Sequence, residues 1–115
     1  MTKNYTDITR SISDGMAKLR EATPEVMKGF GMMAMGAKKA GALDEKTKEL
    51  IALGIGIANH CDGCIGFHTK TLVKLGTTRE EFIEMLSVAM YMGGGPSVMY
   101  ASEALQAFEE FSNSN

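Results

Sequence analysis

The hydrophobic positions of this chain follow a helical rhythm almost throughout. Apolar residues recur at intervals of three and four, as at Ile8, Ile12, Met16 and Leu19, which is typical of amphipathic helices. No segment shows the alternation of apolar and polar residues that favours a strand. The pattern therefore predicts an all-α protein of about six helices. The predicted helices cover about residues 7–22, 24–40, 45–58, 61–75, 79–93 and 97–111.

Residues that favour helix ends support these boundaries. Thr23 followed by Pro24 is a favoured helix start, and Asp44 is a good N-cap for the third helix. Thr78 and Glu81 have the spacing of a capping box before the fifth helix. A length of 115 residues suits one compact domain, so we expect residues 1–115 to fold as a single unit.

The third predicted helix differs from the others because residues 50–58 are apolar on every side. Such a helix is typical of the buried centre of a domain, and we expect it to be surrounded by the other helices. Gly54 and Gly56 lower its intrinsic stability, which suggests that another backbone approaches closely there. The apolar run is nine residues long, well short of the roughly 20 that span a bilayer.

Composition narrows the choice of partner and compartment. The formal charge is −2 and no long basic stretch occurs, so we expect no nucleic-acid partner. The first residues are polar and show no secretion signal, so we expect a cytoplasmic protein without membrane attachment. Methionine occurs ten times, and five copies lie between Met16 and Met35. Flexible thioethers of this kind usually fill irregular contacts in a core or a subunit interface.

The two cysteines carry the clearest chemical signal. They are three residues apart, and in a reducing compartment such a pair is more often redox-active or metal-binding than a structural bridge. On a helix, Cys61, Cys64 and His68 lie within about 60° of one another. The start of a helix stabilises a thiolate, a second sulfur can close a disulfide, and His68 is one turn away as a general base.

An acidic residue on the preceding helix can complete this group. Glu49 lies twelve residues before Cys61, too far to reach it along one straight helix. If the chain reverses near residues 59–62, the third and fourth helices run antiparallel and Glu49 passes beside His68. Glu49 would then orient or charge the imidazole as the third member of a Cys–His–acid relay. The alternative is that Glu49 is a solvated acid paired with Lys46.

Together these residues resemble the signature of the AhpD-like alkylhydroperoxidases, within the carboxymuconolactone decarboxylase superfamily. The resemblance covers about residues 42–106 and includes the flanking pattern as well as the motif. The matching residues are Glu49-Leu50-Ile51, Cys61-x-x-Cys64-x-x-x-His68, Gly76-x-Thr78-x-Glu80-Glu81 and Gly93-Gly94-Gly95. One position departs from the pattern, because Gly63 stands where the best-known enzymes carry a second relay histidine.

The resemblance implies an antioxidant, peroxiredoxin-like alkylhydroperoxide reductase that needs no cofactor and no metal. It implies that Cys64 becomes the sulfenic acid, that Cys61 resolves it to a disulfide, and that Glu49 and His68 relay the proton. The implied partners are a small organic hydroperoxide and a protein or lipoyl dithiol that restores the thiols. It also implies a homo-oligomer, in small members often a hexamer built as a trimer of dimers. The absence of histidine at Gly63 weakens the expectation of fast peroxide turnover.

Other interpretations of the same residues remain open. The dithiol could relay electrons between proteins with little peroxidase activity, which Gly63 favours. The chain could be a non-redox relative such as a lactone decarboxylase, although the decarboxylases of the superfamily lack the cysteine pair. The two cysteines, His68 and Glu49 could hold zinc, but three ligands on one short helix face suit a tetrahedral site poorly. The cysteines could also be inert core thiols.

Overall fold

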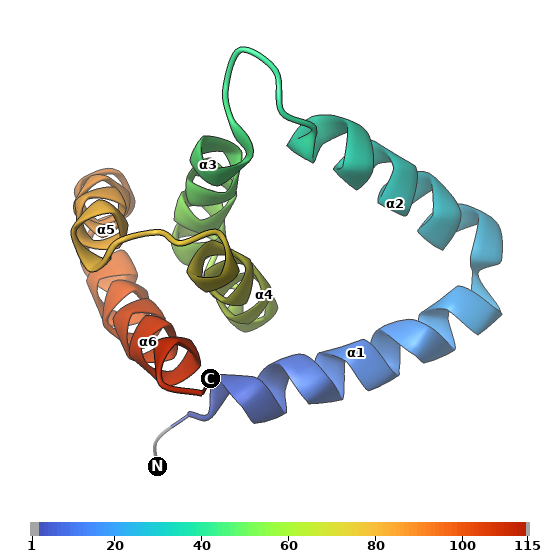
Figure 1. Ribbon diagram of the computed structural model, residues 1–115. Coiled ribbons are helices and arrows are strands. Elements are labelled where there is room, and N and C mark those ends of the chain that lie inside the picture. Colours follow the sequence, from blue (N-terminus) through green and yellow to red (C-terminus); the bar gives the residue numbers. More distant parts are fainter. Residues whose placement is uncertain (1–2, 115) are drawn as a thin grey trace.

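A computed structural model describes residues 3–114, and within this range the chain forms six α-helices (Figure 1). They are α1 (Tyr5–Ala22), α2 (Pro24–Lys38), α3 (Glu45–Ala58), α4 (Asp62–Lys74), α5 (Arg79–Gly93) and α6 (Gly95–Ser112). The all-α prediction is confirmed, and the helices begin and end close to the predicted positions. The sixth helix starts earlier than expected because Pro96 fits its first turn, where a backbone N–H has no partner to lose. Residues 1, 2 and 115 of the predicted domain lie outside the described range.

The predicted caps form at two of the helix starts. The Asp44 carboxylate accepts a hydrogen bond from the Thr47 amide at 2.7 Å and so begins α3. Thr78 and Glu81 form the full capping box, because the Thr78 hydroxyl accepts from the Glu81 amide while the Glu81 carboxylate accepts from the Thr78 amide. Both caps satisfy N–H groups that the first turn of a helix leaves without partners.

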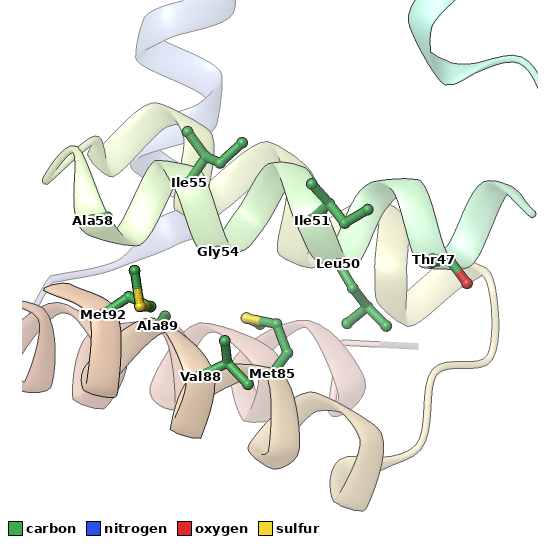
Figure 2. A pocket seen from close by; sticks show the side chains of 10 residues that line it. All are labelled: Thr47, Leu50, Ile51, Gly54, Ile55, Ala58, Met85, Val88, Ala89 and Met92. Carbon is green, nitrogen blue, oxygen red and sulfur yellow. The ribbon is translucent and has the colours of Figure 1, made fainter. Parts of the chain in front are cut away.

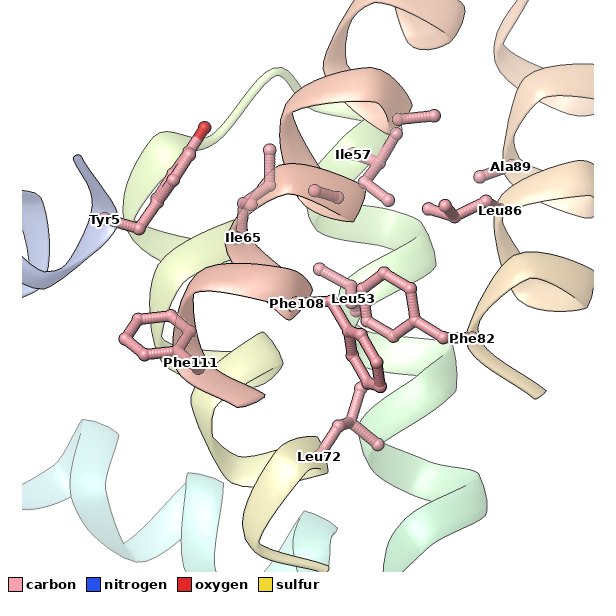
Figure 3. Packing of buried hydrophobic residues seen from close by; sticks show 13 residues of the cluster. Tyr5, Leu53, Ile57, Ile65, Leu72, Phe82, Leu86, Ala89, Phe108 and Phe111 are labelled. Atoms are coloured by element: carbon pink, nitrogen blue, oxygen red, sulfur yellow. The ribbon is translucent and has the colours of Figure 1, made fainter. Parts of the chain in front are cut away.

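The hydrophobic core lies among α3, α4, α5 and α6, with the start of α1 closing one side (Figure 3). Leu53 and Ile57 of α3 are fully buried at its centre. Phe82 of α5 and Phe108 of α6 pack with their ring centroids 4.6 Å apart. The buried hydrophobic residues are Tyr5, Leu53, Ile57, Ile65, Leu72, Phe82, Leu86, Ala89, Ala101, Ala104, Ala107, Phe108 and Phe111.

The first turn of α1 is held on the core by the end of α6. The Glu110 carboxylate accepts hydrogen bonds from the amides of Tyr5 and Thr6 and from the Thr6 hydroxyl. Burial opposes the charge, but the bonds from Thr6 and Tyr5 prevail and hold the pKa of Glu110 below its ordinary value. Beyond this anchor α1 leaves the core, so its apolar face is covered only in part and Leu19 is half exposed.

Helix α2 and the outer side of α3 depart from the expectation of full coverage. In the described chain, no residue of α2 is buried, and the helix stands apart from the core (Figure 1). The prediction that α3 is covered on all sides is wrong for a single chain, because Ile51 and Ile55 are 50% and 56% exposed. The reason is geometric: Leu53 and Ile57 of α3 are fully buried in the core, whereas Ile51 and Ile55 line an open groove between α3 and α5.

Candidate active site

The turn between α3 and α4 reverses the chain at the predicted position. Asn59 ends α3, the His60 amide donates to the Ile57 carbonyl, and the Cys61 amide donates to the Gly56 carbonyl. This pair of bonds is a Schellman motif, which satisfies carbonyl groups left free at the end of a helix. The motif turns the backbone sharply and places Cys61 directly at the start of the next helix.

His60 occupies the position of this motif that glycine usually fills. Its φ of 57° lies in the left-handed region, and it is the one non-glycine residue of the described chain with a positive φ. The imidazole stacks on the Tyr100 ring of α6, with centroids 4.7 Å apart and an angle of 5° between the planes. The stack offsets part of the backbone cost and fixes the turn that carries the cysteines.

Cys61 is the N-cap of α4 and is joined to Cys64 by a disulfide. The Cys64 amide donates to the Cys61 sulfur at 3.1 Å, so a sulfur atom takes the place of the oxygen that usually caps a helix. Both cysteines are partly exposed. When the pair is reduced, the free N–H groups and the dipole of α4 favour a thiolate at this helix start.

Gly56 explains how α3 and α4 come together at the cysteines. A Cβ atom at this position would lie 2.6 Å from the Cβ of Cys64, so any larger residue would push the two helices apart. This contact identifies the close backbone approach that the sequence suggested for the glycine pair. Gly54 has a looser environment, with the Met85 sulfur 3.9 Å from such a Cβ.

Glu49 and His68 face each other across the α3–α4 hairpin. The His68 Nδ1 and the Glu49 Oε1 are 2.7 Å apart, and Glu49 is only 2% exposed. A buried carboxylate in contact with one ring nitrogen fixes the orientation of the imidazole. His68 lies one helical turn beyond Cys64, so its ring is on the same face of α4 as that cysteine.

The alternative pairing of Glu49 with Lys46 is wrong. The Lys46 ammonium instead contacts the Glu81 carboxylate of α5 at 2.7 Å. That hydrogen bond raises the pKa of Lys46 and lowers the pKa of Glu81, as expected for an ion pair at the surface. Glu49 therefore has no lysine partner, and within the described residues its carboxylate hydrogen-bonds only to the side chain of His68.

The departure at Gly63 also has a structural explanation. A Cβ atom there would lie 2.9 Å from the Cδ1 of Ile12, which belongs to α1. Helix α1 thus covers the surface of α4 on which a second relay histidine would stand. A side chain at Gly63 would have to displace the end of Ile12.

A polar network around Asp62 escaped the sequence analysis. The Asp62 carboxylate, between the two cysteines, accepts from the Lys3 ammonium at 2.9 Å and from the Tyr5 hydroxyl at 3.4 Å. Lys3 also contacts Glu103 at 2.7 Å. The bonds to Glu103 and Asp62 raise the pKa of Lys3, and they outweigh burial, which lowers it. Burial, with Glu103 and Asp62 nearby, raises the pKa of Tyr5. Only the favourable place of an acid in the first turn of a helix could have indicated part of this network.

Three further observations concern a possible metal site, a possible membrane span and an apolar groove. Between residues 3 and 114, no group of three or more His, Cys, Asp and Glu side chains is arranged to hold a metal ion. In the same range, no helix combines the length and apolarity that crossing a bilayer requires. An apolar groove between α3 and α5 is lined by none of the four predicted site residues, so it is separate from the dithiol.

Comparison with known proteins places the chain in one family. The model of the carboxymuconolactone decarboxylase family matches residues 24–107. The chain therefore belongs to the carboxymuconolactone decarboxylase family, in the AhpD-like superfamily. The earlier resemblance to this superfamily is confirmed.

Two solved structures share the whole fold. A carboxymuconolactone decarboxylase family protein from Legionella pneumophila, lpg0406, is 59% identical, with a TM-score of 0.92 over 95% of this chain and 97% of that one. The protein TM1620 of Thermotoga maritima, described as possibly involved in antioxidative response, is 30% identical, with a TM-score of 0.77 over 94% and 89% of the two chains. The alkyl hydroperoxide reductase AhpD of Mycobacteroides abscessus is 32% identical over 63 residues, which are 55% of this chain and 36% of that protein.

Proposed function

We propose that this chain is a dithiol oxidoreductase that reduces organic hydroperoxides in the cytosol and is restored by an external dithiol. The observation that carries the proposal is the pairing of the buried Glu49 with His68 on the helix that begins with the Cys61–Cys64 disulfide. An oxidisable pair and a proton relay are the two components that peroxide reduction needs. The partial match to an alkyl hydroperoxide reductase and the antioxidative description of TM1620 support the same chemistry.

The reaction can be written with these residues alone. The Cys64 thiolate attacks the terminal peroxide oxygen, the O–O bond breaks, and the leaving alkoxide takes a proton from His68 to become an alcohol. Cys64 is then a sulfenic acid. The neutral His68 then takes the proton of the Cys61 thiol, the resulting thiolate attacks the Cys64 sulfur, and the S–O bond breaks. The leaving hydroxide takes this proton from His68 and departs as water. Glu49 holds the ring in place through its contact with Nδ1 while the proton passes through His68. A protein or lipoyl dithiol then reduces the disulfide and is itself oxidised.

The assignment of the two cysteines can be tested separately from the overall reaction. Cys64 shares a helix face with His68, which favours it as the group that exchanges a proton. The Cys61 sulfur accepts the Cys64 amide, which favours it as a stabilised thiolate and resolving group. In Cys61→Ser, we expect dimedone to trap a sulfenic acid at Cys64 after hydroperoxide treatment. A sulfenic acid at Cys61 in Cys64→Ser, with none in the first variant, would reverse the two roles.

Steady-state turnover of cumene hydroperoxide with dithiothreitol tests the activity itself. We expect Cys64→Ser to abolish hydroperoxide consumption, because it removes the thiolate that is proposed to attack the peroxide oxygen. Full activity in that variant would contradict the proposal.

One observation favours a second candidate, in which the dithiol relays electrons between proteins and scarcely reacts with peroxide. The position of a second relay histidine is Gly63, and Ile12 covers it. Fast steady-state turnover of the wild type would exclude a pure electron relay. Slow turnover with rapid disulfide exchange would favour it.

We also propose that the protein is a homo-oligomer, specifically a hexamer built as a trimer of dimers. The support is the large apolar surface that a single chain leaves exposed on α2, α3 and α5. The mass of the native protein by light scattering tests this proposal, and a monomeric mass at micromolar concentration would contradict it.

A further inference from the structure

Two apolar surfaces of the chain have no partner within it. One is the outer side of α2, and the other is the groove between α3 and α5 (Figure 2). Neither surface contains a residue of the proposed dithiol site. Exposed apolar surfaces of this extent usually mark an interface.

The outer side of α2 is a regular stripe. Val26, Phe30 and Met33 are 71%, 62% and 62% exposed, and their spacing of four and three residues places them within about 60° around the helix. Met27 and Ala34 are half-buried and lie beside the stripe, about 60° and 40° around the helix from Phe30. The three side chains of the stripe itself stay more than half exposed in the single chain.

The groove has the same periodicity on both walls. Ile51, Ile55 and Ala58 of α3 repeat at four and three residues, and Met85, Val88 and Met92 of α5 repeat at three and four. The groove has a volume of about 440 Å³, and Thr47 is its only lining residue with a polar side chain. Parallel apolar ridges of this spacing are what an amphipathic helix with anchors at i, i+4 and i+7 requires.

Helix α2 cannot fill the groove of its own chain. It is tied to α1 at Thr23 and to α3 through the segment 39–44, and within the described residues it contacts α1 and α3 but not α5. Figure 1 shows α2 and α5 on opposite sides of α3. To enter its own groove, α2 would have to detach from α1, whose first turn is held by Glu110.

The exposed area agrees with a second copy as the occupant. The side chains concerned are Val26, Phe30, Met33, Ile51, Ile55, Val88 and Met92, all at least half exposed. Each offers on the order of 100 Å². A reciprocal exchange between two copies would thus cover roughly 1,400 Å², within the range of stable protein interfaces.

We propose that α2 of one copy lies in the α3–α5 groove of a second copy, with the stripe of Val26, Phe30 and Met33 facing the groove. This inference rests on the proposed self-association and specifies its contact. It also explains why α3 is apolar on all sides although its own chain covers only part of it. Flexible methionines on both surfaces suit a contact between irregular ridges.

Charge insertion on each surface tests the proposal by light scattering. Val88→Glu in the groove and Phe30→Glu on the stripe should each lower the native mass at least two-fold, because the exchanged contact is the same in both. Ser87→Glu and Met35→Glu are matched controls, since they add the same charge to the same helices outside the two surfaces. They should leave the mass unchanged. A wild-type mass in both Val88→Glu and Phe30→Glu would overturn the proposal. This is the result expected if the groove instead holds a small apolar ligand.

A cross-link on the otherwise native chain identifies the contact directly and does not depend on the charged variants folding. Phe30 is replaced by photoreactive benzoylphenylalanine, and light and isotope-labelled chains are mixed before irradiation. Cross-links between light and labelled chains should join position 30 to peptides containing residues 51–58 or 85–92. Cross-links confined to one chain, or to other surfaces, would overturn the proposal. Thiol titration of the same sample tests the proposed dithiol chemistry separately from the proposed contact. If the cross-link forms but the thiols do not react with hydroperoxide, only the dithiol chemistry fails.

Discussion

The turn between α3 and α4 and the turn between α4 and α5 have the same construction but different residues. Each ends a helix with a Schellman motif and starts the next helix one or two residues later. The left-handed position is Gly76 in the second turn, with φ of 77°, and His60 in the first. The N-cap is Thr78 in the second turn and Cys61 in the first.

Two ion pairs near these turns also differ, because one lies at the surface and the other is buried. Lys46 of α3 and Glu81 of α5 form a partly exposed pair that any surface could carry. Glu49, which is on α3 close to Lys46, is buried against His68. A turn built on ordinary residues, such as Gly76 and Thr78, is therefore enough for this fold. In the α3–α4 turn the cap is a cysteine of the proposed dithiol and the left-handed residue next to it is a histidine, and strained or buried polar residues often gather at functional sites.

The largest expected effect separates the two carboxylates. Glu49→Gln keeps the shape of the side chain but removes the charge that stabilises the His68 imidazolium, so hydroperoxide turnover should fall about 100-fold. Glu81→Gln, the matched change in the surface pair, should leave turnover unchanged. The measurement is kcat/KM for cumene hydroperoxide in both variants. An equal effect of the two changes would show that the buried pair has no special role.

The next effect concerns the contact behind the cysteines. Gly56→Ala places a methyl group 2.6 Å from the Cβ of Cys64, and the two helices must separate to admit it. We expect a loss of about 2 kcal/mol in the free energy of unfolding. Gly15→Ala in α1 has open space around it and should instead stabilise the protein by about 0.5 to 1 kcal/mol. Urea unfolding of both variants measures the difference, and a stabilised Gly56→Ala protein would refute the close contact.

A smaller effect is expected at the left-handed residue of the second turn. Gly76→Ala keeps all neighbours at a distance but forces a Cβ atom into the left-handed region, which should destabilise the protein by about 1 kcal/mol. In the first turn the left-handed residue is His60, so here a glycine is introduced rather than removed. His60→Gly should be more stable than His60→Ala by about the same amount, because glycine adopts this conformation freely. Thermal unfolding compares the three variants, and equal stability of the two His60 variants would contradict a strained turn.

The smallest effect is the coupling between His60 and Tyr100. A double-mutant cycle with His60→Ala and Tyr100→Leu should give a coupling free energy of about 0.5 to 1 kcal/mol, the usual value for a stacked pair. The cycle is measured by urea unfolding of the four proteins. Additive effects of the two changes would mean that the rings do not support the turn.

Much of the fold could be predicted from the sequence because local signals agree with the final structure. The helix caps at Asp44 and Thr78 and the apolar rhythm of the helices depend on neighbours along the chain. The pairing of Glu49 with His68 was also predictable, since a reversal between two helices of known length leaves few residues that can meet.

The remaining features depend on contacts between distant residues. The stack of His60 on Tyr100 and the cover of Gly63 by Ile12 have no signature in the local sequence. Gly56 indicated that another part of the chain approaches closely, but not that Cys64 is the residue it contacts. The exposed side of α3 was predicted wrongly because an apolar residue looks the same in sequence whether its own chain or another copy covers it.

The most direct test of the proposed dithiol chemistry is a thiol titration of the reduced wild-type protein before and after one equivalent of cumene hydroperoxide. Mass spectrometry of the product locates any new bond. We predict that both thiols disappear together and that an intramolecular Cys61–Cys64 disulfide forms. Two free thiols after complete incubation, with the hydroperoxide unconsumed, would contradict the proposed peroxide reduction.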